Sequence, residues 1–245
     1  MDEPNGPIAY LETAIRAKNA EDKAPDNTPP SFTLLARVAA SLWFVVMAML
    51  FARGLALTVH AVPPGSTAFA IWAPVLSQSC TLIFFITLGW LVLVRSKAVA
   101  RKEGVIPTTI AFFGTYSVWL MPFLPRAPMT PTFQMVSAAV TLVGSLSIIF
   151  AVLYLGKSFS IAPQARRLVV GGPYRVVRHP LYVAEEIATI GVLMQYSWYA
   201  AVPFLVFHLA LQFRRMDYEE SLLRAVFPDY EAYALRTARL IPGLW

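Results

Sequence analysis

Long apolar runs separated by short polar stretches make up the first two thirds of the chain. Four of these runs approach or exceed the roughly 20 residues that a helix needs to cross a bilayer. They cover residues 33–53, 70–94, 108–124 and 132–156. The first run ends at Arg53-Gly54, where we expect its helix to stop. The pattern predicts four spanning helices and an all-α integral membrane protein.

The last apolar stretch, residues 183–213, is too long for one ordinary span. The segment Gln195-Tyr196-Ser197-Trp198-Tyr199 lies in its middle and is typical of a turn at a membrane interface. We therefore expect a hairpin of two helices, 183–196 and 198–213. Each is short for a span, so the pattern is compatible with a full or a partial crossing.

Beyond the hairpin, residues 214–227 alternate charged and apolar side chains at helical spacing. They predict an amphipathic helix that continues out of the membrane and ends at Pro228, followed by a short second helix with Tyr230 and Tyr233. The chain then divides into three parts. We expect a polar tail over 1–31, a four-helix membrane region over 32–156, and a catalytic region with a C-terminal cytosolic cap over 157–245.

The distribution of basic residues sets the expected orientation. With the hairpin and a cytoplasmic N-terminus, 18 of the 20 lysines and arginines lie on the cytoplasmic side, against 13 without the hairpin. Residues 157–182 and 214–245 then share the cytoplasmic face, where they can build one site. The 15 arginines against five lysines, together with many alanines, indicate a bacterial genome and so an inner-membrane location.

Composition narrows the class of protein further. The chain is 57% hydrophobic and only 14% charged, whereas a soluble domain carries about a quarter charged residues. The net charge of +6 comes from residues between the apolar runs, which suits contact with anionic lipid and argues against nucleic-acid binding. Cys80 is the one cysteine, so we expect neither an internal disulfide nor a cysteine-based metal site.

Residues 171–186 form the most polar segment of the second half, and we interpret them as the core of a cofactor site. Unpaired polar groups at a membrane boundary are costly, so a cluster of them indicates a use. His179 precedes Pro180, which keeps it out of helical geometry and lets it face a ligand or simply cap the next helix. Arg215 and Glu219 are four residues apart on one helical face, as a surface pair or as part of the same site.

Several short motifs together carry a family resemblance. They are Gly172-Pro173-Tyr174, Arg178-His179-Pro180-x-Tyr182, Arg215-x-x-x-Glu219-Glu220 and Tyr230-x-x-Tyr233 followed by Ile241-Pro242. Over residues 157–245 the chain resembles the isoprenylcysteine carboxyl methyltransferases and the related phospholipid methyltransferases. These are integral-membrane enzymes that use S-adenosylmethionine. The first four spans resemble the family only in being spans.

The resemblance implies a set of site residues. The positions that match cofactor contacts are Leu168, Val169, Gly172, Tyr174, Arg178, His179, Pro180, Leu181, Tyr182 and Glu219. The positions that match the substrate and catalytic groups are Arg215, Glu219 and Glu220. No metal ligand is implied. The basic pair Arg166-Arg167 departs from the family pattern and could alter the preferred substrate charge.

Methyl transfer needs positioning and a desolvated nucleophile, with little acid–base work. The implied function is transfer of a methyl group to a lipophilic acceptor in the bilayer, first of all the carboxylate of an isoprenylcysteine-like substrate, which is already ionised near neutral pH. A phospholipid amine or a thiol would have to lose a proton, and Glu220 or His179 is then the candidate base. An NADPH-dependent membrane reductase and a non-enzymatic scaffold or transporter are the competing interpretations.

Overall fold

The computed structural model describes residues 30–66, 68–94, 96, 98–101, 104–160 and 164–243. The expected polar tail therefore lies almost wholly outside the described residues. The long helices are α2 (Pro30–His60), α3 (Phe69–Val94), α4 (Val105–Tyr116), α5 (Pro131–Leu155), α6 (Pro180–Leu193) and α7 (Trp198–Val226). The short elements are α8 (Tyr230–Arg236), the 3-10 turns η1 (Ser117–Phe123), η2 (Gly156–Ser158) and η3 (Gly172–Arg175), and strands β1 (Ala100–Arg101) and β2 (Gln164–Ala165).

Within the described part of the chain, four segments are long and apolar enough to cross a membrane. They are Arg37–His60, Pro74–Val94, Val105–Phe123 and Pro131–Ser158. These segments match the four predicted runs, and the predicted all-α membrane fold is confirmed. The described residues add a small antiparallel ladder that pairs Ala100 with Ala165 and Arg101 with Gln164.

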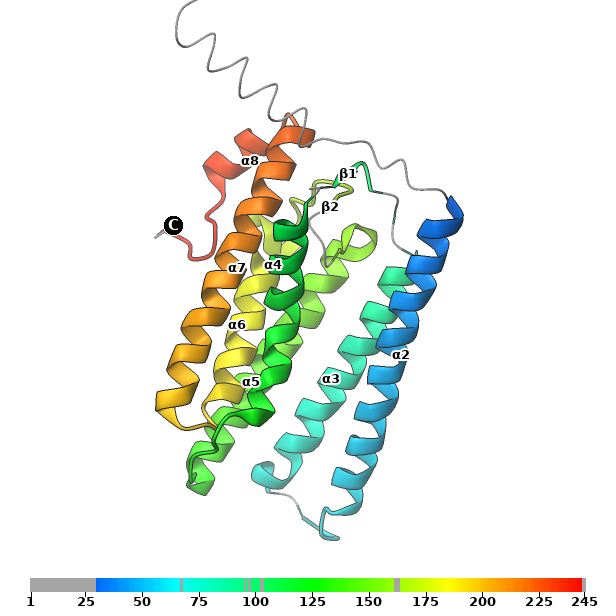
Figure 1. The fold of residues 1–245 in the computed structure, drawn as a ribbon. Coiled ribbons are helices and arrows are strands. Elements are labelled where there is room, and N and C mark those ends of the chain that lie inside the picture. The colour runs from blue at the N-terminus through cyan, green and yellow to red at the C-terminus, as the bar shows by residue number, and fades with distance from the viewer. Residues whose placement is uncertain are drawn as a thin grey trace, which may run out of the picture.

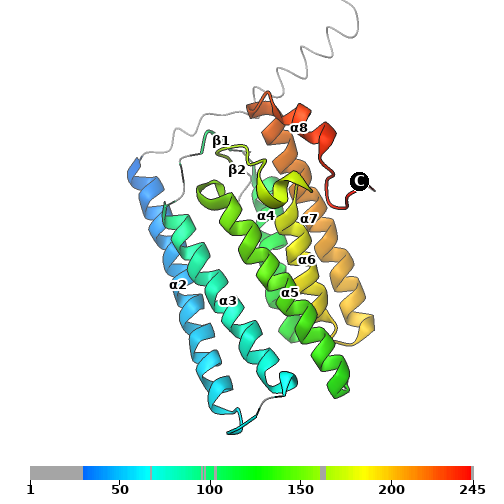
Figure 2. The ribbon, with the colours of Figure 1, turned by 180° about the vertical axis from the view of Figure 1, so that it is seen from behind.

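The helices form an elongated bundle (Figure 1). Helices α2 and α3 pack as a pair, α3 also contacts α5, α5 packs along α6, and α4 packs against α7. Figure 2 shows the same bundle from behind, with the β1–β2 ladder and α8 at one end and the α2–α3 and α6–α7 connections at the other. The basic-residue count placed residues 157–182 and 214–245 on one face, and the described residues of these two segments lie at the same end of the bundle.

The first helix is longer than predicted. Instead of stopping at Arg53-Gly54, α2 continues to His60. A glycine inside a helix costs only about 1 kcal/mol relative to alanine, so packing can override it. Thr58 supplies part of that packing, because its hydroxyl donates to the Gly54 carbonyl at 3.0 Å and lies 3.1 Å from Oε1 of Gln78 on α3.

The hairpin is present with different bounds. Helix α6 begins at Pro180 and ends at Leu193, and α7 runs from Trp198 to Val226. The second helix of the hairpin continues into the amphipathic helix, as the sequence predicts, and the two form one element. The turn between α6 and α7 contacts the segment before α5. The Ser197 amide donates to the Pro125 carbonyl at 2.8 Å, and the Arg126 guanidinium carbon lies 5.4 Å from the centroid of the Tyr196 ring.

Helices α5 and α6 approach each other closely through small residues. A Cβ on Gly144 would lie 2.3 Å from the Ala188 backbone nitrogen, and one on Gly191 would lie 2.5 Å from the Thr141 nitrogen. Ser137 donates a hydrogen bond to the Gly191 carbonyl at 2.7 Å. Small residues let membrane helices pack backbone to backbone, which fixes α6 relative to the spanning α5.

Replacing Gly144 by alanine should therefore destabilise the bundle by about 2 kcal/mol, because the added methyl group meets backbone that cannot move independently. The measurement is the thermal unfolding midpoint of the purified protein in detergent. Gly54→Ala is the matched control, since its Cβ would meet only Gln78 Oε1, at 3.8 Å. Equal midpoints for the two variants would contradict the close α5–α6 contact.

Candidate functional site

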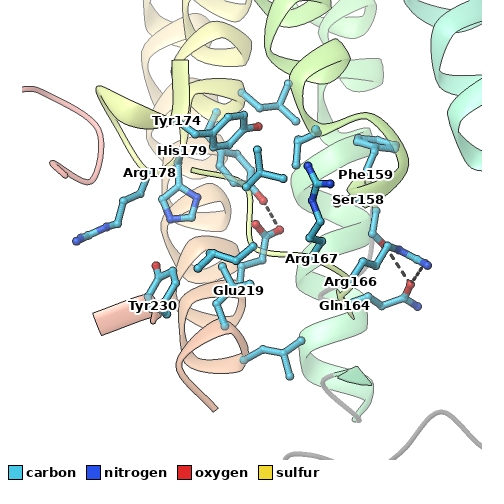
Figure 3. Close-up of a pocket in the computed structure, with 18 of the residues that line it drawn as sticks. Ser158, Phe159, Gln164, Arg166, Arg167, Tyr174, Arg178, His179, Glu219 and Tyr230 are labelled. Carbon is cyan, nitrogen blue, oxygen red and sulfur yellow. Dashed lines mark hydrogen bonds between the residues drawn. The ribbon is translucent and has the colours of Figure 1, made fainter. Parts of the chain in front are cut away.

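A cavity of about 120 Å³ lies at the end of the bundle that carries α8 and the ladder. Its walls come from the end of α5, residues 158–160 and 164–169, η3, the start of α6, the outer part of α7, and α8. Nine residues of the predicted site line it: Leu168, Val169, Tyr174, Arg178, His179, Leu181, Tyr182, Arg215 and Glu219. The two polar segments that the sequence separates by some 35 residues thus face one space (Figure 3).

Three predicted residues do not line this cavity. Gly172 adopts a φ of +56°, and a Cβ there would lie 2.1 Å from the Tyr154 ring, so glycine fits the turn against α5. Pro180 is the first residue of α6, where its missing N–H costs nothing. Glu220 lies beside the cavity in a cluster of cations.

The Glu220 carboxylate joins α7 to the segments on either side of it. Oε1 lies 3.0 Å from His179 Nε2 and 3.2 Å from the Nε atoms of both Arg178 and Arg239, and Oε2 lies 3.2 Å from Arg224. Burial alone would raise the pKa of Glu220, but His179, Arg239 and Arg178 outweigh it and lower the pKa to about 2. Glu220 is therefore a fixed negative charge at neutral pH.

This cluster positions the histidine motif. The backbone amides of Arg178 and His179 donate to the carbonyls of Ala238 and Arg239 at 2.8 and 3.2 Å. The Arg178 guanidinium also donates to the Ala234 carbonyl at 2.7 Å. With its imidazole held by Glu220, His179 presents a fixed ring edge to the cavity. Sequence spacing could have shown Arg224, which lies four residues after Glu220 on the same helix, but not Arg239, which lies beyond α8.

The neighbouring Glu219 points into the cavity from the other side of the helix (Figure 3). It accepts a short hydrogen bond from the Tyr182 hydroxyl and lies 3.4 Å from Arg215 Nε. Arg215 also donates to Thr115 Oγ1 on α4 at 3.0 Å, and its guanidinium carbon lies 5.0 Å from the centroid of the Tyr182 ring. The predicted pair of Arg215 and Glu219 is thus part of a buried network joining α4, α6 and α7.

Two hydroxyls at this cavity are available to a ligand. Tyr174 and Tyr230 both line it, and their buried hydroxyl oxygens have no hydrogen-bond partner among the described residues. Burial, helped by the nearby Glu219, raises the pKa of Tyr174 well above its usual value, so its hydroxyl remains a donor at neutral pH. Buried polar groups are normally satisfied, so these two fit a ligand that carries hydrogen-bonding groups of its own.

A second and larger cavity, of about 520 Å³, lies among α2, α3, α4, α5, α6 and α7, and we call it the chamber. Its walls are mostly apolar and include Phe44, Phe51, Phe84, Phe85 and Trp119. Phe159, Leu181 and Arg215 line both the chamber and the smaller cavity. Because these residues are shared, the polar cavity and the apolar chamber meet at Arg215.

The basic pair that departs from the family pattern also reaches the smaller cavity. Arg166 donates to the Ser96 carbonyl and, at 2.5 Å, to Gln164 Oε1, so it ties the cavity wall to the connection after α3. Arg167 lines the cavity next to it. The described residues contain no cluster of three His, Cys, Asp or Glu side chains suited to a metal ion.

Comparison with known proteins shows that the polar cluster lies within a segment that matches the model of a protein family. Residues 132–230 match the model of the phospholipid methyltransferase family. A cobalt-zinc-cadmium resistance protein, CzcN, of Cupriavidus metallidurans is 29% identical over 119 residues, which are 48% of this chain and 51% of that protein. A nickel-cobalt-cadmium resistance protein, NccN, of Alcaligenes xylosoxydans xylosoxydans is 31% identical over 113 residues, 44% of this chain and 53% of that protein.

The chain thus spans about half the length of the curated relatives it matches. Among solved structures, the eukaryotic intramembrane Ras methyltransferase ICMT, an isoprenylcysteine carboxyl methyltransferase, aligns with a TM-score of 0.49 at 17% identity over 96% of this chain and 93% of that chain. The family resemblance expected from the motifs is confirmed: residues 132–230, from α5 to the start of α8, match the model of the phospholipid methyltransferase family.

Proposed function

We propose that this chain is a membrane methyltransferase that moves the methyl group of S-adenosylmethionine to a lipophilic acceptor. The observation that carries the proposal is the junction at Arg215, where a polar cavity meets a large apolar chamber. A charged, water-soluble methyl donor suits the first space, and a lipid-like acceptor suits the second. The match of residues 132–230 to the phospholipid methyltransferases supports the same reaction class.

The smaller cavity offers groups that fit the donor. Glu219 supplies a carboxylate for its amino group, and Tyr182 and Arg215 orient that carboxylate. Tyr174 and Tyr230 supply the unpartnered hydroxyls, and His179 supplies an aromatic edge. S-adenosylmethionine, when bound, would provide an electrophilic methyl group. The protein's own work would be to hold the two reactants in line and to exclude water, which the apolar chamber walls favour.

The resemblance suggests an isoprenylcysteine-like carboxylate as acceptor, with Arg215 as its guanidinium partner, and a phospholipid amine or a thiol as the alternatives. The chamber accommodates the apolar part of any of these. We further propose that the site faces the cytoplasm of a bacterial inner membrane, since most basic residues belong to that end of the bundle. In the proposed division of the chain, residues 32–156 contribute chamber walls and residues 157–245 contribute the donor site.

Calorimetric titration of S-adenosylmethionine into the detergent-purified protein tests this function. The wild type should bind, and Glu219→Ala and His179→Ala should each lose at least about tenfold in affinity, because one removes the carboxylate and the other loosens the cavity wall. His60→Ala, at the opposite end of the bundle, is the control and should bind like the wild type. Binding of NADPH but not of S-adenosylmethionine by the folded protein would overturn the proposal in favour of a reductase.

A further inference from the structure

The chamber contains one carboxylate among its lining residues, and that carboxylate has no ion-pair partner within 4 Å among the described residues. Glu185 on α6 lines the chamber and accepts a hydrogen bond from Gln212 Nε2 of α7 at 2.8 Å. Gln212 is itself fully buried, so the amide holds one carboxylate oxygen in a fixed place. A carboxylate among apolar helices costs about 2.5–3.5 kcal/mol on insertion, which makes it a functional candidate by default.

Glu186, the next residue on α6, is a carboxylate with a purely structural environment. It lies 3.2 Å from His208 Nε2, and His208 Nδ1 lies 2.9 Å from Ser117 Oγ. His208 belongs to α7, so the Glu186 carboxylate lies next to a titratable group of a neighbouring helix. Glu186 does not line the chamber. The two adjacent carboxylates thus differ in position: Glu186 lies beside His208, and Glu185 faces the space in which an acceptor would lie.

Titratable groups surround Glu185 from several helices that line the chamber. They are Arg215 and His208 from α7, Glu186 and Tyr182 from α6, Tyr116 from α4 and Tyr196 from the hairpin turn. The polar side chains that α3 and α5 contribute to the described lining are neutral hydroxyls. They belong to Ser77, Thr81, Thr141 and Ser145. Among the described lining residues, Arg215 is the one permanent positive charge, and it sits where the chamber meets the smaller cavity.

We propose that Glu185 is a catalytic base of this site, which takes the proton that an acceptor nucleophile gives up when it is methylated. The inference rests on the proposed methyl transfer. An N–H bond of the acceptor's ammonium form, or the S–H bond of a thiol, breaks and its proton goes to the Glu185 carboxylate. The freed electron pair forms the new bond to the methyl carbon, and the carbon–sulfur bond of the sulfonium breaks, leaving its electron pair on a neutral thioether.

This assignment changes the expected acceptor. A carboxylate acceptor has no proton to give and would be repelled by Glu185, whereas an amine or a thiol uses it. The other candidate bases are less suited. Glu220 does not line the cavity, and three arginines and a histidine hold its carboxylate. His179 is the histidine bound to Glu220. Glu185 instead lies on the chamber side of Arg215, where the apolar acceptor would be.

The test uses full-length protein in lipid nanodiscs with three probes of equal chain length: dodecylamine, dodecanethiol and dodecanoate. Labelled methyl transfer should reach the amine or the thiol and not dodecanoate. Glu185→Gln should lower kcat/KM by about a hundredfold and abolish its rise with pH, and Glu185→Asp should recover part of the rate. Glu186→Gln is the matched control and should keep the pH profile of the wild type.

A second readout does not depend on turnover. In calorimetric titrations without the methyl donor, wild-type protein should bind dodecylamine more tightly than Glu185→Gln does, by about tenfold. Preferred methylation of dodecanoate, an unchanged pH profile in Glu185→Gln, or equal dodecylamine binding would each overturn the role of Glu185. If the wild type did not bind S-adenosylmethionine, the proposed function itself would be refuted. Failure of the role of Glu185 and failure of the proposed function are therefore distinguishable.

Discussion

Replacing Arg215 by alanine should lower methyl transfer by about a hundredfold, the cost of losing the alignment of the acceptor with the methyl donor. Arg215 is buried, lines both cavities, and contacts Thr115 on α4 and Glu219 on its own helix. Its loss removes the cation at the place where the donor and the acceptor meet. The measurement is the rate of labelled methyl transfer from S-adenosylmethionine to the best of the three lipid-like probes.

The affinity for S-adenosylmethionine should meanwhile stay within about tenfold of the wild type, because Tyr174, Tyr182 and Glu219 remain. Arg214→Ala is the matched control: Arg214 is the preceding residue, is exposed, and should leave turnover unchanged. If Arg215→Ala loses donor affinity as strongly as turnover, Arg215 holds the donor rather than aligning the acceptor.

Replacing Glu220 by glutamine should destabilise the folded protein by about 3 kcal/mol, since it leaves partly buried cations without their shared anion. The measurement is the thermal unfolding midpoint in detergent at neutral pH. Asp217→Asn is the control: that carboxylate pairs with Arg239 from an exposed position, where such a pair contributes at most about 1 kcal/mol. An unfolding midpoint equal to that of the wild type would show that the cluster does not hold the cap.

The same carboxylate gives the wild type a defined acid sensitivity. Because folding lowers the pKa of Glu220 from 4.5 to about 2, its contribution to stability is complete above about pH 4.5. The contribution is lost as the pH falls from there towards 2. Glu220→Gln lacks this titration, so its unfolding midpoint should depend less on pH over that interval.

The sequence predicted the parts of the fold that depend on continuous hydrophobicity and local spacing. The four spans follow from run length, and Arg215 and Glu219 share a cavity because four residues make about one helical turn. The extension of α2 past Gly54 was missed because the contact with Gln78 is a tertiary one. The start of α6 was placed at residue 183 instead of Pro180, because the apolar run begins later than the helix, whose first position is the proline.

The partners of the site residues were the least predictable part. Arg239 reaches Glu220, and Gln212 reaches Glu185, only after α6, α7 and the C-terminal segment have packed together. No periodicity in the sequence reports such long-range pairs. The sequence also did not predict that bulky aromatic residues line one chamber. These residues come from separate helices, which the sequence shows only as apolar.

The carboxylates of α6 have a consequence for how the chain enters the membrane. Glu185 and Glu186 emerge from the ribosome before Gln212 and His208, which bind them from α7. Two uncompensated carboxylates would cost a lone α6 several kcal/mol in the bilayer. Insertion of α6 together with α7 reduces that cost, because Gln212 and His208 then lie beside the two carboxylates.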